Sequence, residues 1–359
     1  MLTVRRIDSL ADLTALGPAW SDLFRRCPGR NLFLTHDWAR TWWEFFGKGS
    51  ELWILVVCDG SEPVGIAPMM LRRESHLAVP VRVLGLITNR HVSRTDFIIP
   101  ERREEVFRAL VEFWQEMSSS WDMLRFPGVP GESGTTRLLV ESIAGSRLRA
   151  CPVEAHKELC FLPVSGTWEE YLAGRSRNFR RNHVRLGNRL NELPRVAFEL
   201  DETPASVDES MTRLFSLQGA GADGESRRTG LDENERQFHR TLAARFAAHG
   251  GFQNRFIVAD GTTIAGLHSL VCDGVLYALL TSYSARHAKA SPGRNILGHT
   301  LAESWRDPRI RRIDLNGSSA FLRTWTDQSV KLENLTVGND RPYSKLVERL
   351  RRTKKAMGR

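Results

Sequence analysis

The sequence predicts an α+β protein made of two tandem domains, each with a mixed, mostly antiparallel sheet flanked by helices. Three observations lead to this prediction. The chain has 359 residues, which is more than one ordinary hydrophobic core accommodates. A strong hairpin signal occurs twice, at Asp59-Gly60 and at Asp260-Gly261. The expected helices and strands also follow the same order in both halves.

The two hairpin signals lie in similar surroundings. "LWILVVCDGSEPVGIAPMML" and "NRFIVADGTTIAGLHSLV" each read as a strand, Asp-Gly, and a second strand that contains a glycine, Gly65 or Gly266. Asp-Gly between alternating apolar runs is typical of a two-residue hairpin turn. The matched residues are all 201 positions apart (260 − 59 and 266 − 65). This spacing predicts an internal duplication.

Apolar periodicity assigns the elements of the second half. Helices are expected where apolar residues recur every three or four positions, as for Phe238, Leu242 and Phe246. The expected order is strand 196–200, helix 205–218, helix 232–249, strands 252–259, 263–272 and 275–284, helix 293–305 and strand 310–315.

The first half gives the same order of elements. They are expected as strand 3–7, helix 10–25, helix 35–46, strands 52–58, 64–72 and 79–87, helix 101–117, strand 121–126, helix 133–143 and strand material up to Pro163. Turn residues in "VSGTW" then indicate a boundary. We therefore expect domains at 1–164 and 165–340 and a basic helix or tail at 341–359.

Charge is concentrated in two segments. The formal net charge is +9. Residues 341–359 contain eight Lys or Arg and one Glu, and residues 175–191 contain six Arg and no acid. The remainder therefore carries 9 − 7 − 6 = −4. This is a mildly acidic body with two basic helices, which argues against a general nucleic-acid binder.

Several classes of protein do not fit the composition. The five cysteines have no CxxC spacing, as expected for reduced thiols in a cytoplasmic protein. The start lacks an apolar signal core, and no run of about 18 apolar residues exists. Without HExxH or paired Cys/His spacing, no metal is expected. "GRNILGHT" has His299 where a P-loop needs lysine, so nucleotide hydrolysis is not expected.

The stretch "SPGRNIL" lies at a strand-to-helix corner. The first amides of a helix lack internal partners and, with the helix dipole, form a ready anion site. Gly293 would let backbone approach a phosphate, and Arg294 would add charge. The alternative is structural, with Ser291 as the N-cap and Pro292 as the first helical residue.

The element order β-α-α-β-β-β-α-β resembles that of the GNAT acyltransferases. Within that superfamily, "SRNFRRNHVRLGNRLNE", "SPGRNIL", "IDLNGSSAFLRTWT", "NLFLTHDWARTWWEFFG" and "VGIAPMMLRR" resemble the CelD-like acetyltransferases of exopolysaccharide and cellulose biosynthesis. The tandem arrangement is also similar to the FemABX transferases, which use aminoacyl-tRNA. The resemblance implies acetyl-coenzyme A or another acyl-coenzyme A as co-substrate, bound at Ser291, Gly293, Arg294, Asn295 and Ile296.

Two features depart from the resemblance. The family commonly carries Tyr-Lys after the glycine that follows its Asp strand, whereas this chain has Phe321-Leu322 followed by Arg323. Leu322 in place of lysine leaves open whether activity is retained or Arg323 takes over that role. The first half has "TNRHVSRTDF", without glycine, where a phosphate loop would lie. We therefore expect a degenerate first domain that supports the fold and contributes an acceptor wall.

Three side chains are candidates for catalysis. Asp314 ends an apolar strand and would accept a proton from an amine, or it caps the Asn316-Gly317 turn. Tyr283 ends the neighbouring strand and would protonate the departing thiolate, or it is an aromatic core residue. His268 lies on the second strand of the hairpin, as a catalytic group or as a hydrogen-bonded core histidine.

The arginines at 177, 181, 185 and 189 repeat every four residues on one helix face. They form a solvated basic face or bind a polyanion or an anionic membrane surface; base-stacking aromatics are missing, so nucleic acid is not expected. The sequence thus predicts acyl transfer from coenzyme A to a small-molecule or saccharide amine. The alternatives are an aminoacyl-tRNA-dependent transferase and a non-catalytic scaffold of polysaccharide assembly.

Overall fold

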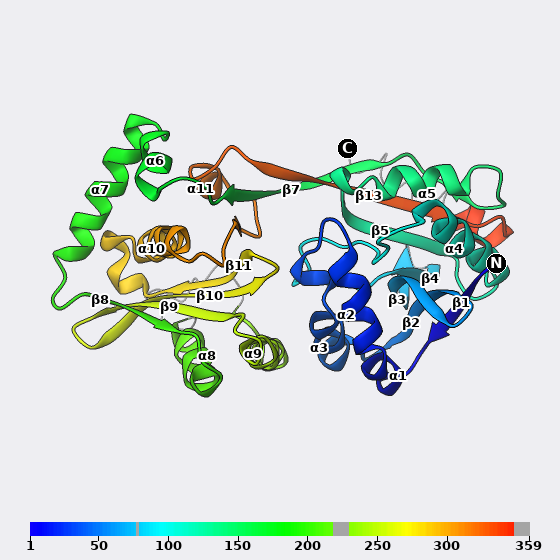
Figure 1. Cartoon of the computed structure of the whole chain (residues 1–359), viewed down its shortest axis with the longest axis horizontal. Helices are drawn as coiled ribbons and strands as arrows, with labels where there is room; N and C mark the ends of the chain where they lie inside the picture. Colours follow the sequence, from blue (N-terminus) through cyan, green and yellow to red (C-terminus); the bar gives the residue numbers. More distant parts are fainter. Residues whose placement is uncertain (77–78, 218–229, 348–359) are drawn as a thin grey trace. The chain divides into compact units, whose positions relative to one another are not determined.

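The chain divides into two units that interleave along the sequence. The computed structural model describes residues 1–76, 79–217 and 230–347. Met1–Glu158 and the chain from Val330 onward form the first unit, and Leu159–Ser329 form the second. Figure 1 shows the elements of both units. Each unit has its own hydrophobic core.

The first unit contains a sheet in the order β1-β2-β3-β4-β5-β13, and only β4 and β5 pair in parallel. The short β6 also pairs with β13. The strands are β1 (Leu2–Ile7), β2 (Ser50–Asp59), β3 (Glu62–His76), β4 (Val79–Leu86), β5 (Met123–Pro130), β6 (Arg149–Ala150) and β13 (Ser329–Gly338). The helices are α1 (Leu10–Ala15), α2 (Gly17–Arg26), α3 (His36–Phe46), α4 (Arg103–Glu116) and α5 (Thr135–Ile143).

The second unit contains a sheet in the order β8-β9-β10-β11-β12-β7, and only β11 and β12 pair in parallel. Its strands are β7 (Glu154–Pro163), β8 (Ala197–Asp201), β9 (Phe252–Ala259), β10 (Thr262–Cys272), β11 (Val275–Tyr283) and β12 (Arg312–Asp314). Its helices are α6 (Trp168–Ala173), α7 (Arg177–Asn191), α8 (Val207–Ser216), α9 (Glu233–Ala247), α10 (Pro292–Arg306) and α11 (Ala320–Arg323). In Figure 1, α10 lies on one face of this sheet and α8 and α9 lie on the other.

The two sheets have the same strand order and the same single parallel pair, which confirms the predicted α+β tandem arrangement. A shared irregularity strengthens the equivalence. Pairing in the first hairpin passes from Cys58↔Pro63 to Val57↔Gly65, which leaves Val64 as an extra residue. The second passes from Val258↔Thr263 to Ile257↔Ala265, which leaves Ile264. Both hairpins therefore carry a β-bulge at the same distance from the turn.

The predicted offset of 201 is wrong by one residue. The turns are Gly60-Ser61 and Asp260-Gly261, and the bulged residues are Val64 and Ile264, so equivalent positions lie 200 apart. A one-residue shift moves a side chain to the other face of a strand. A Cβ on Gly65 would meet Val106 of α4, whereas one on Gly266 would meet Leu214 of α8. The two glycines are therefore not equivalent.

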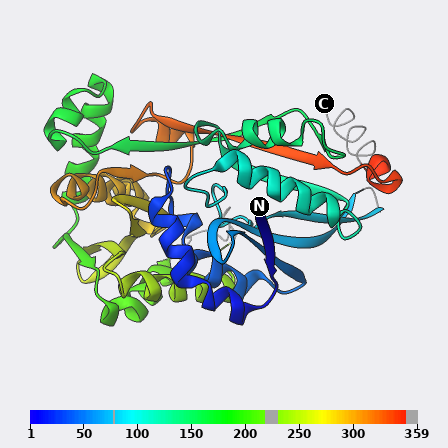
Figure 2. The same ribbon diagram turned by 45° about the vertical axis from the view of Figure 1, so that its right-hand side comes forward.

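The last strands of the two halves are exchanged. β7, which ends the first half of the sequence, pairs with β12 of the second unit. β13, which ends the second half, pairs with β5 of the first unit; both views show β13, drawn in orange-red, running along the teal elements (Figures 1 and 2). The division at 158/159 and 329/330 thus differs from the expected boundaries at 164 and 340. The turn signal at 164 marks the end of a strand but not the sheet that this strand joins.

Other expected elements differ in detail. The expected helix 10–25 is broken into α1 and α2, because Pro18 at the start of α2 cannot continue the preceding hydrogen-bond ladder. β13 was not expected, and neither was α11, which is a single turn. The end of the expected helix 205–218 and residues 348–359 of the expected basic tail lie outside the described residues.

Candidate functional site

The sheet of the second unit opens between β11 and β12. These strands pair over only three residues, from Val275↔Arg312 to Tyr277↔Asp314. β11 continues to Tyr283 and remains paired with β10 on its other side. Its edge from residue 278 onward faces no partner strand among the described residues. The result is a gap with β11 along one side and the end of β12 at its base.

An irregularity in β11 lies along this gap. Pairing with β10 shifts between His268↔Leu280 and Ser269↔Ala278, which leaves Leu279 as a bulged residue. A bulge interrupts the ladder and turns the local backbone. In the first unit, β3 and β4 pair without a shift from Met69↔Leu86 to His76↔Val79. A bulged strand beside a long gap is therefore a property of the second unit.

Helix α10 begins just beyond the end of β11. Ser291 has a left-handed backbone (φ 49°), and its side chain makes no capping hydrogen bond, so the expected side-chain cap is absent. Its carbonyl accepts from the Arg294 and Asn295 amides instead. A Cβ on Gly293 would lie 2.8 Å from the Tyr283 ring. Glycine is needed here because this aromatic ring covers the first turn of α10.

Two of the five expected cofactor-binding residues have internal roles. The Asn295 amide donates to the carbonyls of Leu186 in α7 and Ala290, at 3.1 and 2.8 Å. Ile296 is fully buried in the core of the second unit. These side chains hold the helix start in place. The corner itself, with Ser291, Gly293 and Arg294, remains a candidate anion site.

The Arg294 side chain is held by aromatic rings. Its guanidinium lies 5.0 Å from the Phe179 ring centroid and 4.9 Å from that of Trp325. Such cation–π contacts suit arginine because its guanidinium is planar and weakly hydrated. Burial lowers the pKa of Arg294, although the group stays charged at neutral pH. Its Nε atom is buried and makes no hydrogen bond to a described residue.

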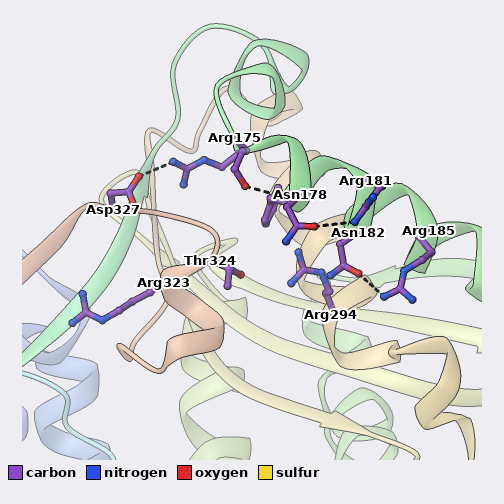
Figure 3. A pocket seen from close by; sticks show the side chains of 11 residues that line it. Arg175, Asn178, Arg181, Asn182, Arg185, Arg294, Arg323, Thr324 and Asp327 are labelled. Atoms are coloured by element: carbon purple, nitrogen blue, oxygen red, sulfur yellow. Dashed lines mark hydrogen bonds and ion pairs between the residues drawn. The ribbon is translucent and has the colours of Figure 1, made fainter.

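Arg294 lines a cationic pocket of about 830 Å³, which we call the arginine pocket. Figure 3 shows its side chains, which come from α7, α10 and the segment around α11, with Arg323 extending away from Arg294. The lining residues are Arg175, Ser176, Asn178, Phe179, Arg181, Asn182, Arg185, Arg294, Arg323, Thr324 and Asp327. Five arginines and one aspartate give a formal charge of +4. This arrangement suits a ligand with several negative charges.

The partners of these arginines leave much of the charge uncompensated. Arg175 pairs with Asp327 at 2.7 Å. Arg185 donates to the Asn182 side-chain oxygen at 2.6 Å, and Arg181 makes a long contact of 3.4 Å with Asn178. Neutral amide partners orient a guanidinium without cancelling its charge. The α7 arginines are therefore placed to bind an anion.

The expected catalytic residues Asp314 and Tyr283 lie on the two strands that border the gap. Asp314 ends β12, is buried, and accepts the Asn316 amide at 2.9 Å. Tyr283 ends β11 and is 53% exposed. The turn-capping contact of Asp314 is thus present, and its position at the base of the gap also allows a role in proton transfer.

His268 lies elsewhere. It is fully buried, and its Nδ1 lies 2.7 Å from the Asn254 side-chain oxygen, whose amide in turn donates to Ser210 of α8. Its ring also lies near that of His239 in α9. This is the α8/α9 face of the sheet, opposite α10. Burial lowers the pKa of His268 to about 3, so this histidine is a neutral core residue.

This burial predicts a measurable pH dependence of stability. Because the folded-state pKa is below the ordinary value of 6.5, the unfolded chain binds the proton more strongly. Stability is therefore present above pH 6.5 and decreases as pH falls toward 3. Between pH 8 and pH 5 the wild type should lose about 2 kcal/mol more of its unfolding free energy than His268→Gln. Urea unfolding at both pH values measures this difference; equal losses in the two proteins would contradict it.

Known proteins support the fold. The family model described as "Acetyltransferase (GNAT) domain" matches residues 177–323. The structure is similar to that of FemX, with a TM-score of 0.64, 12% identity, and coverage of 96% of this chain and 99% of that one. No curated protein matches the chain in sequence.

Two further structures have similar folds. A tandem GNAT protein from the clavulanic acid biosynthesis pathway has a TM-score of 0.50 and 13% identity, and the similarity covers 95% of this chain and 99% of that one. For the C-terminal domain of a putative lysylphosphatidylglycerol synthetase from Agrobacterium fabrum, the values are 0.54, 13%, 92% and 93%. Residues 177–323 therefore match the GNAT acetyltransferase domain model, and the chain shares the fold of these tandem structures; the CelD-like resemblance remains a prediction.

Two negative findings apply to the described residues. No helix there is long and apolar enough to cross a membrane. No group of three His, Cys, Asp or Glu side chains is placed to hold a metal ion in that part of the chain.

Sequence reasoning identified only part of the pocket. Arg323, which stands after the position of the family lysine, lines it, whereas Leu322 packs against the core. Of the regularly spaced α7 arginines, Arg181 and Arg185 line the pocket, and Arg177 and Arg189 do not. Their spacing marks one helix face, but only the packing of α7 beside α10 shows which part of that face meets the α10 corner.

Proposed function

We propose that this protein is an acyltransferase that moves an acyl group from an acyl-coenzyme A to an acceptor amine. The observation that carries the proposal is the gap between β11 and β12, which has the α10 corner and the arginine pocket beside it. The GNAT match over residues 177–323 supports the same class of reaction.

The residues present fit coenzyme A. Its phosphates are compact and highly charged, as the arginine pocket requires. The helix dipole adds about 0.3–1 kcal/mol at the start of α10. Arg294, at the helix start, would hold the phosphates together with Arg181 and Arg185 of α7. Coenzyme A supplies an activated thioester; binding and orienting it is the task of these side chains.

The side chains along the gap suggest roles in the reaction. Asp314, at the base of the gap, would accept the proton of the acceptor amine. A backbone amide of β11 near the Leu279 bulge would donate a hydrogen bond to the reacting carbonyl oxygen, since oriented amides stabilise developing negative charge. The Tyr283 hydroxyl would return a proton to the departing sulfur.

The acceptor is proposed from the family resemblance and from the charge of α7. Resemblance to the CelD-like acetyltransferases suggests a small-molecule or saccharide amine in exopolysaccharide or cellulose biosynthesis, carried out in the cytoplasm. The exposed arginines of α7 outside the pocket would add affinity for a polyanionic acceptor or an anionic membrane surface.

Calorimetric titration with acetyl-coenzyme A tests the donor site. We expect Gly293→Asp to abolish measurable binding, because it adds a negative charge to the first turn of α10, where the phosphates would bind. Any side chain at residue 293 also displaces Tyr283, so Gly293→Ala is the matched control and should retain most of the affinity. Equal affinity of folded Gly293→Asp and wild type would refute the donor site.

A second donor is favoured by one observation. The similarity to FemX extends over nearly the whole of both chains, and the arginine pocket would also accept RNA phosphates. An RNA minihelix ending in CCA should then displace acetyl-coenzyme A from the pocket, or it should bind to the protein while acetyl-coenzyme A does not bind at all. Binding of the minihelix alone would support an aminoacyl-tRNA donor; binding of neither ligand would support a non-catalytic scaffold.

A further inference from the structure

A second pocket adjoins the arginine pocket. It has a volume of about 300 Å³, and we call it the aromatic pocket. Its lining includes Tyr171, Trp305 and Trp325. Arg175 and Asp327 line both pockets. The ion pair between them, at 2.7 Å, is therefore part of the lining of both pockets, which places the two pockets next to each other.

The aromatic rings of this pocket are fixed in place. The Tyr171 hydroxyl donates to the Trp325 carbonyl at 2.5 Å, and the Trp305 indole N–H donates to the Ser165 carbonyl at 3.2 Å. The two ring centroids lie 5.0 Å apart with the planes inclined by 37°. Both polar groups are thus satisfied by backbone. The rings form a prearranged apolar surface whose ordering costs little entropy when a ligand binds.

The pocket combines flat apolar walls with polar groups at its rim. Asp327 is 82% exposed on its side chain, so its carboxylate can also accept hydrogen bonds from a ligand. The Gln328 side chain, also in the lining, offers both a donor and an acceptor. A nucleobase matches this combination, because it has two flat faces for stacking and a polar edge for hydrogen bonds.

We infer that the aromatic pocket binds the adenine ring of the donor while the arginine pocket binds its phosphates. This inference rests on the proposed function and deepens it by assigning a nucleoside subsite. Adenine is the expected occupant because Arg175 and Asp327 line both this pocket and the arginine pocket, where the phosphates would bind. Coenzyme A carries adenine and phosphates within one nucleotide, so a single nucleotide can contact both pockets.

A pocket-filling variant tests the inference. Gly174 lines the aromatic pocket and has an ordinary helical backbone (φ −70°). A Cβ there would make only ordinary contacts, 3.5 Å or longer. Gly174→Leu should therefore fold and occupy the pocket. Gly187→Leu is the matched control, because Gly187 lies on α7 outside both pockets and a Cβ there would contact nothing within 4 Å.

Three ligands separate the subsites: coenzyme A, adenosine 3′,5′-bisphosphate, which lacks the pantetheine arm, and 4′-phosphopantetheine, which lacks the nucleoside. Base stacking typically supports about a tenfold or larger effect. Gly174→Leu should weaken binding of the first two ligands by at least that factor and leave the third unchanged. Gly187→Leu should bind all three as the wild type does. Adenosine 3′,5′-bisphosphate should also quench tryptophan fluorescence of the wild type, which tests the inference without any variant.

The outcomes distinguish this inference from the proposed function. If coenzyme A binds but Gly174→Leu leaves its affinity unchanged, or if the bisphosphate causes no quenching, the adenine subsite is refuted and the proposed donor survives. An unchanged donor affinity with a raised KM for the acceptor would place the acceptor in the aromatic pocket, which also overturns the inference. If the wild type binds no coenzyme A, both are overturned.

Discussion

Reversing the charge of Arg181 and Arg185 together is expected to weaken acetyl-coenzyme A binding by roughly 100-fold or more. The change lowers the formal charge of the arginine pocket from +4 to 0, since each Arg→Glu removes two units of charge. Hydrogen bonds to charged groups contribute about 1.5–3 kcal/mol each, and about 1.4 kcal/mol corresponds to a tenfold change in affinity. Isothermal titration at low and high salt measures the loss.

The same helix provides the control. Arg177→Glu with Arg189→Glu makes the same change in net charge on α7, but neither residue lines the pocket. This control should reduce affinity only through the long-range field, and added salt should remove that reduction. If the two double variants lose the same affinity, the arginines act as a diffuse basic face and do not form a phosphate site.

The sequence predicted the repeated fold because local signals specify each element. Apolar periodicity and two Asp-Gly turns were enough to place most strands along the chain, and the sheets of the two units have the same strand order. The register was wrong by one residue, since the Asp59-Gly60 and Asp260-Gly261 dipeptides match as letters but occupy different positions in their turns. The position of a turn depends on the register in which the two strands pair, and a local sequence pattern does not specify this register.

The exchange of β7 and β13 could not be predicted from the sequence for a related reason. Both strands are of ordinary length and mix apolar with charged residues, and their partners β12 and β5 lie far away in the chain. The free energy that selects a partner comes from burial and from hydrogen bonds across the sheet. A boundary drawn at a turn signal therefore divides the sequence at a different point from the structure.

The site shows the same limits. The Ser291–Asn295 corner was identified from helix-start chemistry. Arg323 was identified because it follows Leu322, which stands where the family commonly has lysine. The individual roles were less predictable. Gly293 accommodates Tyr283, and the Asn295 side chain ties α10 to α7, which helix-start chemistry alone does not indicate. The contacts that a polar side chain makes depend on neighbours from distant segments of the chain.

Asp314→Asn is expected to lower kcat by about 10²–10⁴-fold, the usual contribution of a positioned base, while acetyl-coenzyme A affinity stays nearly constant. Asp314 ends β12 at the base of the gap, whereas the arginine pocket is lined by other residues. Asparagine keeps an oxygen that can accept the Asn316 amide, now 2.9 Å from the carboxylate. The substitution thus removes the basic group and preserves the turn cap.

Asp314→Ala and Tyr283→Phe complete this test. Asp314→Ala removes both the base and the cap, so it should lower the melting temperature as well as kcat, because a buried amide loses its acceptor. Tyr283→Phe should cost less activity, since solvent can protonate a thiolate of ordinary pKa about 8.5. Turnover by Asp314→Asn close to that of the wild type, combined with reduced stability of Asp314→Ala, would assign Asp314 to the turn alone. Water or a group of the substrate itself would then accept the proton from the amine.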